Sequence, residues 1–448
     1  MSPSMIRVRF APSPTGQVHI GNIRTAIFNW LFARHEGGRF LLRIEDTDRE
    51  RSTPEAIGTL LDVMAWMGLD IDEPPLYQSH RRERHLAAAE ELLRRDLAYR
   101  SDKGAAGKGE AILFRMPQRD AVFDDMIRGR LVKPAASLQD FVIVRSDGQP
   151  VFHLANVVDD IDMAITHVIR GDDHVENTYR HIQLFEALGA ARPVFAHLPM
   201  LVNDQGKPFS KRDGDAFVGD FRTKGYLPQA LFNFLALLGW SPGDDREYMP
   251  RPEMIEAFDL RRVKPSPAQL NLQKLDWMNG CYMADLPRAE FAEQARPILR
   301  AAALVDDTTD PAYLRRVLEL VQDRIKIWSD LADATGYLLR DEYPHDDKAV
   351  RKRLVKDGVP ALLAALAERY RAQPAWDAAA LERELRAVLG EGADNAAQLI
   401  HPVRVAVTGR GAGPGLFEIL ELLGRDRVLR RLERGIDLAR AGLAQPAG

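Results

Sequence analysis

The chain has 448 residues, of which 46% are hydrophobic and 28% are charged, and its formal net charge is −4. This ordinary globular composition favours a large protein of roughly two to four domains. Since the 61 basic residues are outnumbered by 65 acidic ones, any nucleic-acid-binding surface must come from local clusters of basic residues. No apolar run reaches the ~18–20 residues of a membrane span, and the first residues lack the apolar region of a secretory signal. We expect no membrane partner.

The cysteine content limits both redox chemistry and metal binding. The single cysteine, Cys281, excludes an internal disulfide and any zinc site that is built from several cysteines. A reducing cytoplasm suits such a chain. We therefore expect a cytoplasmic protein that holds no zinc.

The first predicted elements are a strand, a tight turn and a helix. An alternating apolar run at 6–10 precedes the sequence APSPTGQVHIGN at 11–22, and a helix-like run spans 20–35. This order aims backbone N–H groups and the positive end of a helix dipole at the turn, where phosphate is the usual ligand. His19 can donate to a phosphate oxygen, and Gly21 allows a close approach to the backbone. The alternative role of His19 is that of a structural cap.

Strands alternate with helices up to about residue 240, which is typical of an α/β doubly wound parallel sheet. The predicted strands are residues 8–11, 39–44, 141–145, 164–169 and 194–198. A helix begins at the N-cap signal Thr53-Pro54. Residues 77–150, which include a basic helix at 81–95, predict a small inserted domain, and the sheet pattern resumes at Val151. From about residue 310, apolar residues spaced three and four apart predict helices throughout.

Carboxylates follow the second predicted strand. Glu45, Asp46 and Asp48 stand at its carboxyl end. Ligands of open α/β sheets bind beyond the carboxyl ends of the strands, so these side chains suit an ammonium group or a share in Mg²⁺ binding. Asp46 and Asp48 have a second interpretation, in which they only cap a turn and pair with Arg49 and Arg51.

A second polar group surrounds the fourth predicted strand. Asn156 and the pair Asp159-Asp160 precede this strand, and Arg170 closes it within HVIRGDDH at 167–174. A guanidinium group binds a carboxylate in a bidentate way. The alternative is a structural ion pair between Arg170 and Asp159 or Asp160.

A glycine-flanked loop, NDQGKPFSKRDG, spans residues 203–214. Ser210 offers a hydroxyl and a backbone N–H, Lys211 offers a point charge, and Arg212 follows them. Together these groups suit a mobile clamp on a polyphosphate.

These motifs resemble those of bacterial-type glutamyl-tRNA synthetases, which are class I aminoacyl-tRNA synthetases. HIGN at 19–22 is similar to the His-Ile-Gly-His signature, and PFSKR at 208–212 is similar to the Lys-Met-Ser-Lys-Ser signature. The other similar segments are RIEDTD at 43–48, HLANVVDD at 153–160, THVIRGDDH at 166–174, KLDWMN at 274–279 and HPVRVAVTG at 401–409. The resemblance covers nearly the whole chain.

The resemblance implies a Rossmann-like doubly wound parallel sheet with an inserted acceptor-binding domain, followed by an all-α anticodon-binding region. The implied domains are a catalytic domain at 1–76 and 151–240, the inserted domain at 77–150, a stem-contact domain at 241–310 and a helical anticodon-binding domain at 311–448.

The resemblance also implies ATP-dependent activation of L-glutamate to glutamyl-adenylate and transfer to the 3'-terminal adenosine of tRNA(Glu). His19 and Lys211 are the implied catalytic residues, and Mg²⁺ accompanies ATP in a monomeric enzyme. The implied ATP-binding residues are Pro12, Ser13, Thr15, Gly16, His19, Gly21, Asn22, Asp173, Met200, Leu201, Ser210, Lys211 and Arg212. The implied glutamate-binding residues are Arg9, Ala11, Ser13, Glu45, Phe152, Asn156 and Arg170.

Arg324 aligns with an arginine that some relatives use to read the third anticodon base, which implies discrimination against tRNA(Gln). Basic clusters at 351–356 and 425–434 are further candidates for RNA contact, or else solvated helix faces. The alternatives are a non-discriminating enzyme that also charges tRNA(Gln) and a paralogue that binds tRNA without charging it. A glutamyl-queuosine tRNA(Asp) synthetase lacks the helical region, and a glutaminyl-tRNA synthetase has a β-barrel there.

Three features depart from the family pattern. Pro208 replaces the first lysine of the loop signature, and Phe152 stands where the family usually has tyrosine. The inserted domain is short and lacks the zinc-binding cysteines of some relatives. A lost tyrosine hydroxyl removes a hydrogen bond worth about 0.5–1.5 kcal/mol, which predicts modest glutamate affinity.

Overall fold

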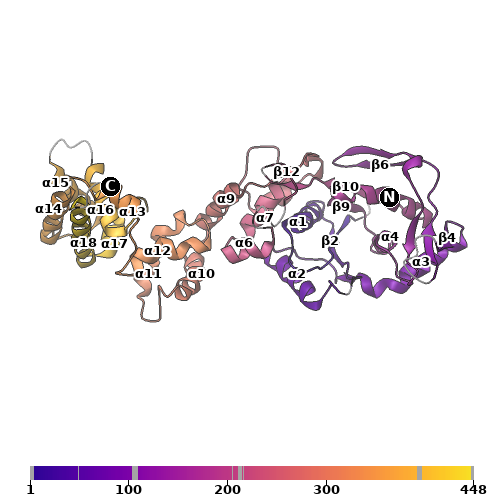
Figure 1. Ribbon diagram of the computed structural model, residues 1–448, viewed down its shortest axis with the longest axis horizontal. Coiled ribbons are helices and arrows are strands. Elements are labelled where there is room, and N and C mark those ends of the chain that lie inside the picture. Colours follow the sequence, from indigo (N-terminus) through magenta and orange to yellow (C-terminus); the bar gives the residue numbers. More distant parts are fainter. Residues whose placement is uncertain are drawn as a thin grey trace. The chain divides into compact units, whose positions relative to one another are not determined.

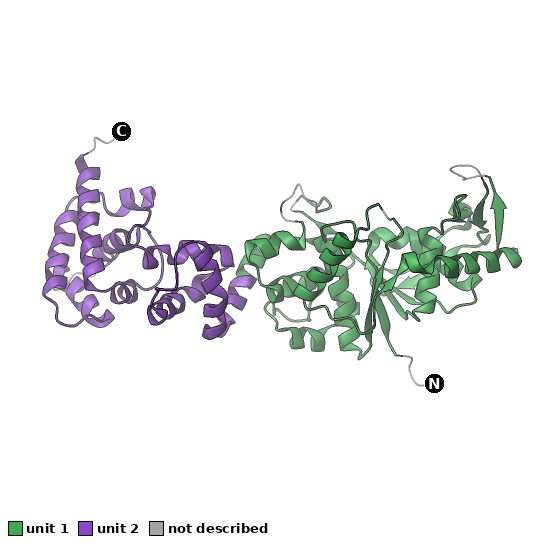
Figure 2. Ribbon diagram, turned by 90° about the horizontal axis from the view of Figure 1, so that it is seen from below, with its two compact units in different colours: residues 1–278 green, residues 279–448 purple. Residues whose placement is uncertain are grey.

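The computed structural model describes residues 5–48, 50–102, 109–203, 205–209, 214, 216–390 and 396–444. It divides into two compact units, residues 1–278 and 279–448 (Figure 2). Within the described ranges, no helix has both the length and the apolar character needed to cross a bilayer.

The first unit mixes strands and helices (Figure 1). Its strands are β1 (Arg7–Phe10), β2 (Arg39–Ile44), β3 (Leu76–Tyr77), β4 (Ala98–Ser101), β5 (Ala111–Phe114), β6 (Ala121–Asp125), β7 (Gly129–Lys133), β8 (Phe141–Val144), β9 (His167–Gly171), β10 (Val194–Leu198), β11 (Leu201–Val202) and β12 (Ala268–Gln269). Its α-helices are α1 (Ile20–His35), α2 (Pro54–Trp66), α3 (Arg82–Arg94), α4 (Phe152–Asp162), α5 (Val175–Ala187), α6 (Val218–Lys224), α7 (Pro228–Leu237), α8 (Arg251–Ala257) and α9 (Leu272–Asp285), the last of which continues into the second unit. Its short 3₁₀ helices are η1 (Gln78–Arg81), η2 (Ala135–Ser137), η3 (Asp172–His174) and η5 (Leu260–Arg262).

Parallel pairing dominates the central strands. β1, β2 and β3 pair in parallel in that order, and β9, β10 and β6 do the same, with β7 antiparallel at the edge. The two sets meet where the N–H of Thr166, just before β9, donates to the carbonyl of Arg7 at 2.9 Å. The predicted α/β fold is therefore confirmed, with an antiparallel edge strand added.

The turn between β1 and α1 forms as its sequence predicts. His19 is the N-cap of α1, and its Nδ1 accepts from the N–H of Gly21 at 3.1 Å. α1 is buried on nearly every side by apolar residues such as Ile23, Phe28 and Leu31, as expected of a helix packed between a sheet and other helices. The helix ends before Gly37, whose φ of +62° favours glycine.

Where the sheet pattern is predicted to resume at Val151, the first element is a helix. Residues 152–162 form the helix α4, whose buried face includes Leu154, Val157 and Val158. Strand β9 begins only at His167, because Ala164 adopts a positive φ of +51° and turns the chain there. The pair Asp159-Asp160, which precedes this strand in the sequence, lies on α4.

Residues 98–144 add a second, antiparallel sheet of order β4-β5-β8. The predicted strand at 141–145 is thus real, but it belongs to this separate sheet. Apolar residues of this segment, including Phe114 and Ile143, share one buried cluster with Leu154 of α4 and Phe195 of β10. The proposed domain boundaries at 76 and 150 stay a prediction.

The described residues of the second unit form helices, as predicted for the region from about 310. They are α10 (Arg288–Ala301), α11 (Pro311–Val321), α12 (Leu331–Leu339), α13 (Asp347–Arg353), α14 (Val359–Ala372), α15 (Ala378–Leu389), α16 (Ala397–Thr408), α17 (Leu416–Leu423) and α18 (Arg425–Ala444), with short 3₁₀ helices η6 (Gln322–Arg324) and η7 (Trp328–Asp330).

Candidate active site

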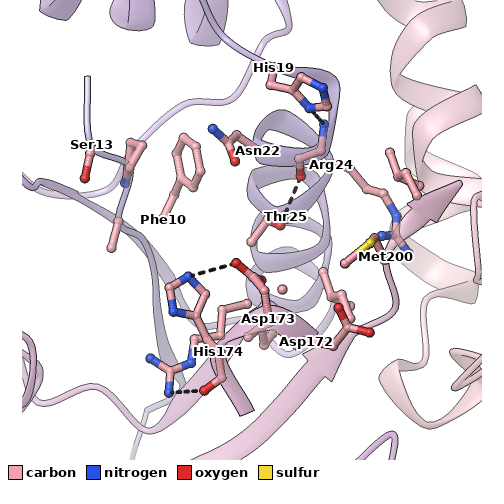
Figure 3. A pocket seen from close by; sticks show the side chains of 18 of the residues that line it. Phe10, Ser13, His19, Asn22, Arg24, Thr25, Asp172, Asp173, His174 and Met200 are labelled. Atoms are coloured by element: carbon pink, nitrogen blue, oxygen red, sulfur yellow. Dashed lines mark hydrogen bonds and ion pairs between the residues drawn. The ribbon is translucent and has the colours of Figure 1, made fainter. Parts of the chain in front are cut away.

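A cleft of about 740 Å³ opens at the carboxyl ends of β1, β2, β9 and β10. Figure 3 shows His19 at the start of α1 and Asn22 and Thr25 on it, with Asp173 and His174 opposite them beyond the end of β9. The predicted residues that line the cleft are Arg9, Ala11, Pro12, Ser13, Thr15, His19, Gly21, Asn22, Glu45, Phe152, Asn156, Arg170, Asp173, Met200 and Leu201. The fold thus gathers residues from segments up to about 190 positions apart, as expected at the carboxyl edge of such a sheet.

Arg170 is a buried cation that lacks an acidic partner among the described residues. Its guanidinium donates to Thr178 Oγ1 at 2.7 Å and faces His197 Nε2 at 3.4 Å and His181 Nδ1 at 3.5 Å. Burial, with help from the charge of Arg9, lowers the pKa of Arg170 to about 9. The group stays protonated at neutral pH, so a positive charge surrounded by neutral acceptors faces the cleft.

The alternative pairing of Arg170 with Asp159 or Asp160 does not occur. Asp160 binds two other arginines, with its carboxylate 3.0 Å from Arg9 Nε and also in contact with Arg43 Nη1. Burial raises the pKa of Asp160, but Arg43 and Arg9 outweigh that effect and lower it overall. Asp159 points elsewhere, toward His85 at 2.8 Å.

Glu45 lies beside this pair of arginines, is buried and lines the cleft. Its Oε1 accepts from Arg43 Nη2 at 3.1 Å and from Asn156 Nδ2 at 2.9 Å. Burial raises the pKa of Glu45, and Arg43 and Arg9 counteract that rise. Since both contacts use Oε1, the carboxylate keeps its other oxygen for a cationic ligand group.

The opposite end of the cleft suits an anion. The imidazole of His19 accepts at Nδ1, so Nε2 carries the proton and can donate. Burial lowers the pKa of His19, which keeps this donor neutral at physiological pH. A Cβ at position 21 would lie 3.3 Å from His19 Nδ1, which explains the glycine there. The first N–H groups of α1 already have acceptors, since Ile20 N–H donates to the carbonyl of Ala216 and Asn22 N–H to that of His19. The helix therefore contributes the positive end of its dipole to this end of the cleft.

Comparison with known proteins identifies the family. The model of the catalytic domain of class I tRNA synthetases (E and Q) matches residues 5–106 and 101–277, and an anticodon binding domain model matches residues 290–436. A glutamate–tRNA ligase of Methylacidiphilum infernorum is 42% identical, covering 96% of this chain and 98% of the relative. The chain belongs to the glutamate–tRNA ligase family of class I aminoacyl-tRNA synthetases.

Other members of the family agree in sequence and in structure. A glutamate–tRNA ligase of Cupriavidus pinatubonensis is 40% identical over 96% of this chain and 99% of its own length. The crystal structure of a glutamate tRNA ligase from Elizabethkingia meningosepticum, in complex with its amino acid, superposes with a TM-score of 0.86 at 29% identity. That match covers 97% of this chain and 99% of the other.

Several predicted residues lie away from the cleft or outside the described residues. Gly16 does not line the cleft, and its φ of +113° marks it as a turn residue. Asp48 pairs with Arg51, as the turn-capping alternative has it, whereas Asp46 accepts from the backbone and the hydroxyl of Ser79. Arg49, Ser210, Lys211 and Arg212 lie outside the described residues.

Two arginines near the cleft were missed from the sequence. Arg43 links Glu45 to Asp160, and its signal was a charged residue inside an otherwise apolar strand, RFLLRI. Arg24 of α1 donates to the carbonyls of Leu238 and Pro199 at 2.9 and 2.6 Å and thereby holds the segment before Met200. Burial lowers the pKa of Arg24 to about 10.

In the second unit, Arg324 is exposed at the end of η6. The turn is anchored by the buried side chain of Gln322, which donates to the carbonyls of Met283 and Leu286 at 3.0 and 2.7 Å. The charge of Arg324 contributes to the lowered pKa of Arg404, for which burial is the larger cause.

The two basic clusters differ in their partners. Within the described part of the chain, Arg351, Lys352, Arg353 and Lys356 form no ion pair, so their charges stay uncompensated. Most arginines of α18 are engaged instead. Arg427 and Arg434 pair with Asp341 and Glu342, and Arg431 donates to backbone carbonyls.

Proposed function

We propose that this chain activates L-glutamate with ATP to form glutamyl-adenylate and pyrophosphate, and then transfers the glutamyl group to the 3'-terminal adenosine of tRNA(Glu). The observation that carries the proposal is Arg170, a buried cation without an acidic partner among the described residues, set beside Glu45 in one cleft. An unpaired cation and an adjacent carboxylate complement an amino acid that bears a carboxylate and an ammonium group.

At the end of the cleft that takes the amino acid, the side chains that already have a charged partner are less available to the substrate than those that have none. Arg9 shares Asp160 with Arg43, so Arg170 is the stronger attractor for a carboxylate of glutamate. Arg9 then either contacts the second carboxylate of glutamate or offsets the negative charge around it. Glu45 binds the α-ammonium group. Phe152 lines the same space, so its missing hydroxyl weakens glutamate binding without removing the charges that recognise it.

At the phosphate end, the α-carboxylate of glutamate attacks the α-phosphate of ATP and pyrophosphate leaves. Such steps depend on positioning and electrostatic stabilisation. His19 Nε2–H and the N-terminus of α1 stabilise the developing charge. Lys211 adds a point charge within the loop, with Ser210 and Arg212 around it, while Asp173, Met200 and Leu201 surround the adenosine.

Mg²⁺ accompanies ATP in this proposal and supplies charge neutralisation at the phosphates. Mg²⁺ usually binds through one or two carboxylates together with substrate oxygens. Asp173 lies between the adenosine and the phosphates in this proposal and would share in holding the ion, since its exposed carboxylate faces only His174 Nε2 at 3.7 Å among the described residues, whereas Asp172 is engaged with Arg128. Cys281 is the single cysteine, so no zinc site with several cysteines is available.

The helical second unit supports anticodon recognition. Arg324 reads the third anticodon base and makes the enzyme discriminate against tRNA(Gln), and the uncompensated cations at 351–356 contact the phosphate backbone. The described helices at 279–390 and 396–444 favour a glutamate enzyme over a glutaminyl-type β-barrel and over a queuosine-directed relative that lacks this region. The alternatives that stay open are a non-discriminating enzyme and a non-charging paralogue.

We further propose a monomeric cytoplasmic enzyme divided at the predicted boundaries of 76, 150, 240 and 310. Size-exclusion chromatography with light scattering tests the monomer. Charging assays with glutamate and purified tRNA(Glu) and tRNA(Gln) test the function. Glutamate-dependent charging of tRNA(Glu) supports it, and tRNA binding without charging establishes the paralogue instead.

A further inference from the structure

A buried aspartate–histidine pair stands behind Arg170, outside the lining of the cleft. Asp125, at the end of β6, and His197, in β10, are both buried. Asp125 Oδ2 lies 2.6 Å from His197 Nδ1, and His197 Nε2 lies 3.4 Å from Arg170 Nε and 2.9 Å from Thr178 Oγ1. The pair therefore connects a buried carboxylate to the guanidinium that faces the ligand.

The hydrogen bonds fix the tautomer of His197. An arginine carries donors only, so Nε2 of His197 must accept and must be unprotonated. The proton then sits on Nδ1 and is donated to Asp125 Oδ2. Burial lowers the pKa of His197 despite the opposing effect of Asp125, which agrees with a neutral ring.

The other neighbours of Arg170 follow the same pattern. His181 Nδ1 faces Arg170 Nη1 at 3.5 Å, and His181 Nε2 lies 3.2 Å from His153 Nδ1. Arg170 Nη2 donates to Thr178 Oγ1. Three neutral side-chain acceptors thus hold the guanidinium, and Nη2 also lies 3.5 Å from the carbonyl oxygen of His174, while Arg170 itself lines the cleft.

We propose that Asp125 and His197 are positioning residues, which lock one histidine tautomer and thereby aim the guanidinium of Arg170 at a carboxylate of the amino-acid substrate. This inference rests on the proposed function and extends it to two residues that touch no substrate. The carboxylate of Asp125 thus orients the guanidinium of Arg170 through His197, and it does not itself form an ion pair with that guanidinium.

Asp125→Asn is a sharp test because the backbone fixes the orientation of the new amide. Asp125 Oδ1 accepts from the N–H groups of Ile127 and Arg128 at 3.0 and 2.9 Å. The Asn oxygen keeps those contacts, so its NH₂ group faces His197 Nδ1. His197 then switches to the Nε2–H tautomer and opposes the N–H of Arg170, a reversal of the kind known to disable other aspartate–histidine pairs.

The experiment measures charging of tRNA(Glu) by the full-length chain with glutamate and ATP varied separately. Asp125→Asn should raise the KM for glutamate about tenfold or more, since a misaligned charge-assisted hydrogen bond costs that much affinity. The KM for ATP should stay within about twofold. Long-range proton–nitrogen-15 spectra should show His197 protonated on Nδ1 in the wild type and on Nε2 in the variant.

Asp159→Asn is the matched control, since Asp159 and His85 form a second buried pair at 2.8 Å that does not contact Arg170. It should leave the KM for glutamate within about twofold of the wild type. Adding His197→Gln to Asp125→Asn restores an acceptor near Arg170 and should recover part of the loss.

Equal rises of both KM values, or an equal effect of Asp159→Asn, would assign Asp125 a merely structural role and overturn the inference. An unchanged His197 tautomer in Asp125→Asn would do the same without any activity measurement. Absence of glutamate-dependent charging by the wild type refutes the proposed function instead, and the tautomer spectra still decide whether the pair acts as inferred.

Discussion

Replacing Arg170 by methionine should abolish glutamate activation and at the same time stabilise the fold. The methionine side chain has a similar length and no charge. Arg170 is 7% exposed and has no acidic partner among the described residues. A site that keeps a cation buried for a ligand is expected to lower the stability of the ligand-free protein.

The size of the effect follows from the pKa and the contacts. Lowering the pKa of Arg170 from its ordinary range to about 9 corresponds to ~4–5 kcal/mol of unfavourable burial. The bond to Thr178 Oγ1 at 2.7 Å and the longer contacts to His197 and His181 offset ~2–3 kcal/mol of this. The net gain in the free energy of unfolding should be ~1–3 kcal/mol.

Urea unfolding followed by circular dichroism measures this change, with and without glutamate. The wild type should gain stability when glutamate is added, and Arg170→Met should not. A variant that is less stable than the wild type, or that is still stabilised by glutamate, would refute the role given to Arg170.

Three further changes separate the parts of the site. Lys211→Ala should keep the fold and slow adenylate formation about a hundredfold, by loss of a charge on the leaving phosphates; unchanged pyrophosphate exchange would reject that role. Arg324→Gln should reduce the ratio of kcat/KM for tRNA(Glu) over tRNA(Gln) about 5- to 150-fold, which corresponds to ~1–3 kcal/mol, while activation stays intact; an unchanged ratio would mean that Arg324 does not read the base. Asp160→Asn should lower the free energy of unfolding by ~3–5 kcal/mol at neutral pH, because Arg9 and Arg43 lose their shared carboxylate. Since the folded-state pKa of Asp160 is lowered, its contribution is complete above about pH 4 and disappears as pH falls through the folded value, so wild type and variant should converge in acid.

The sequence predicted those elements that local chemistry determines. The bounds of α1, β2 and β10 agree with the predicted ranges, because apolar runs there end at Gly, Pro or acidic residues. The start of α4 was missed since its buried polar residues, Asn156 and Asp160, break the usual apolar spacing of a helix. Their burial depends on arginines from other strands, which no local pattern reveals.

The sequence could predict individual site residues only where they belong to a motif. His19, Glu45 and Arg170 lie in the cleft as expected. The pairing that distinguishes Arg170 from Arg9 depends on which arginine reaches Asp160, and that is a property of the folded sheet. Asp125 and His197 are 72 positions apart and carry no motif, so their contact appears only in three dimensions.

The central claim is that this cleft activates glutamate. ATP–pyrophosphate exchange by the purified full-length chain, with glutamate, glutamine or aspartate and with or without tRNA(Glu), tests it most directly. The account predicts exchange that depends on glutamate, that glutamine and aspartate do not support, and that Arg170→Met removes. Exchange supported equally by glutamine, or none with glutamate even when tRNA(Glu) is present, would contradict it.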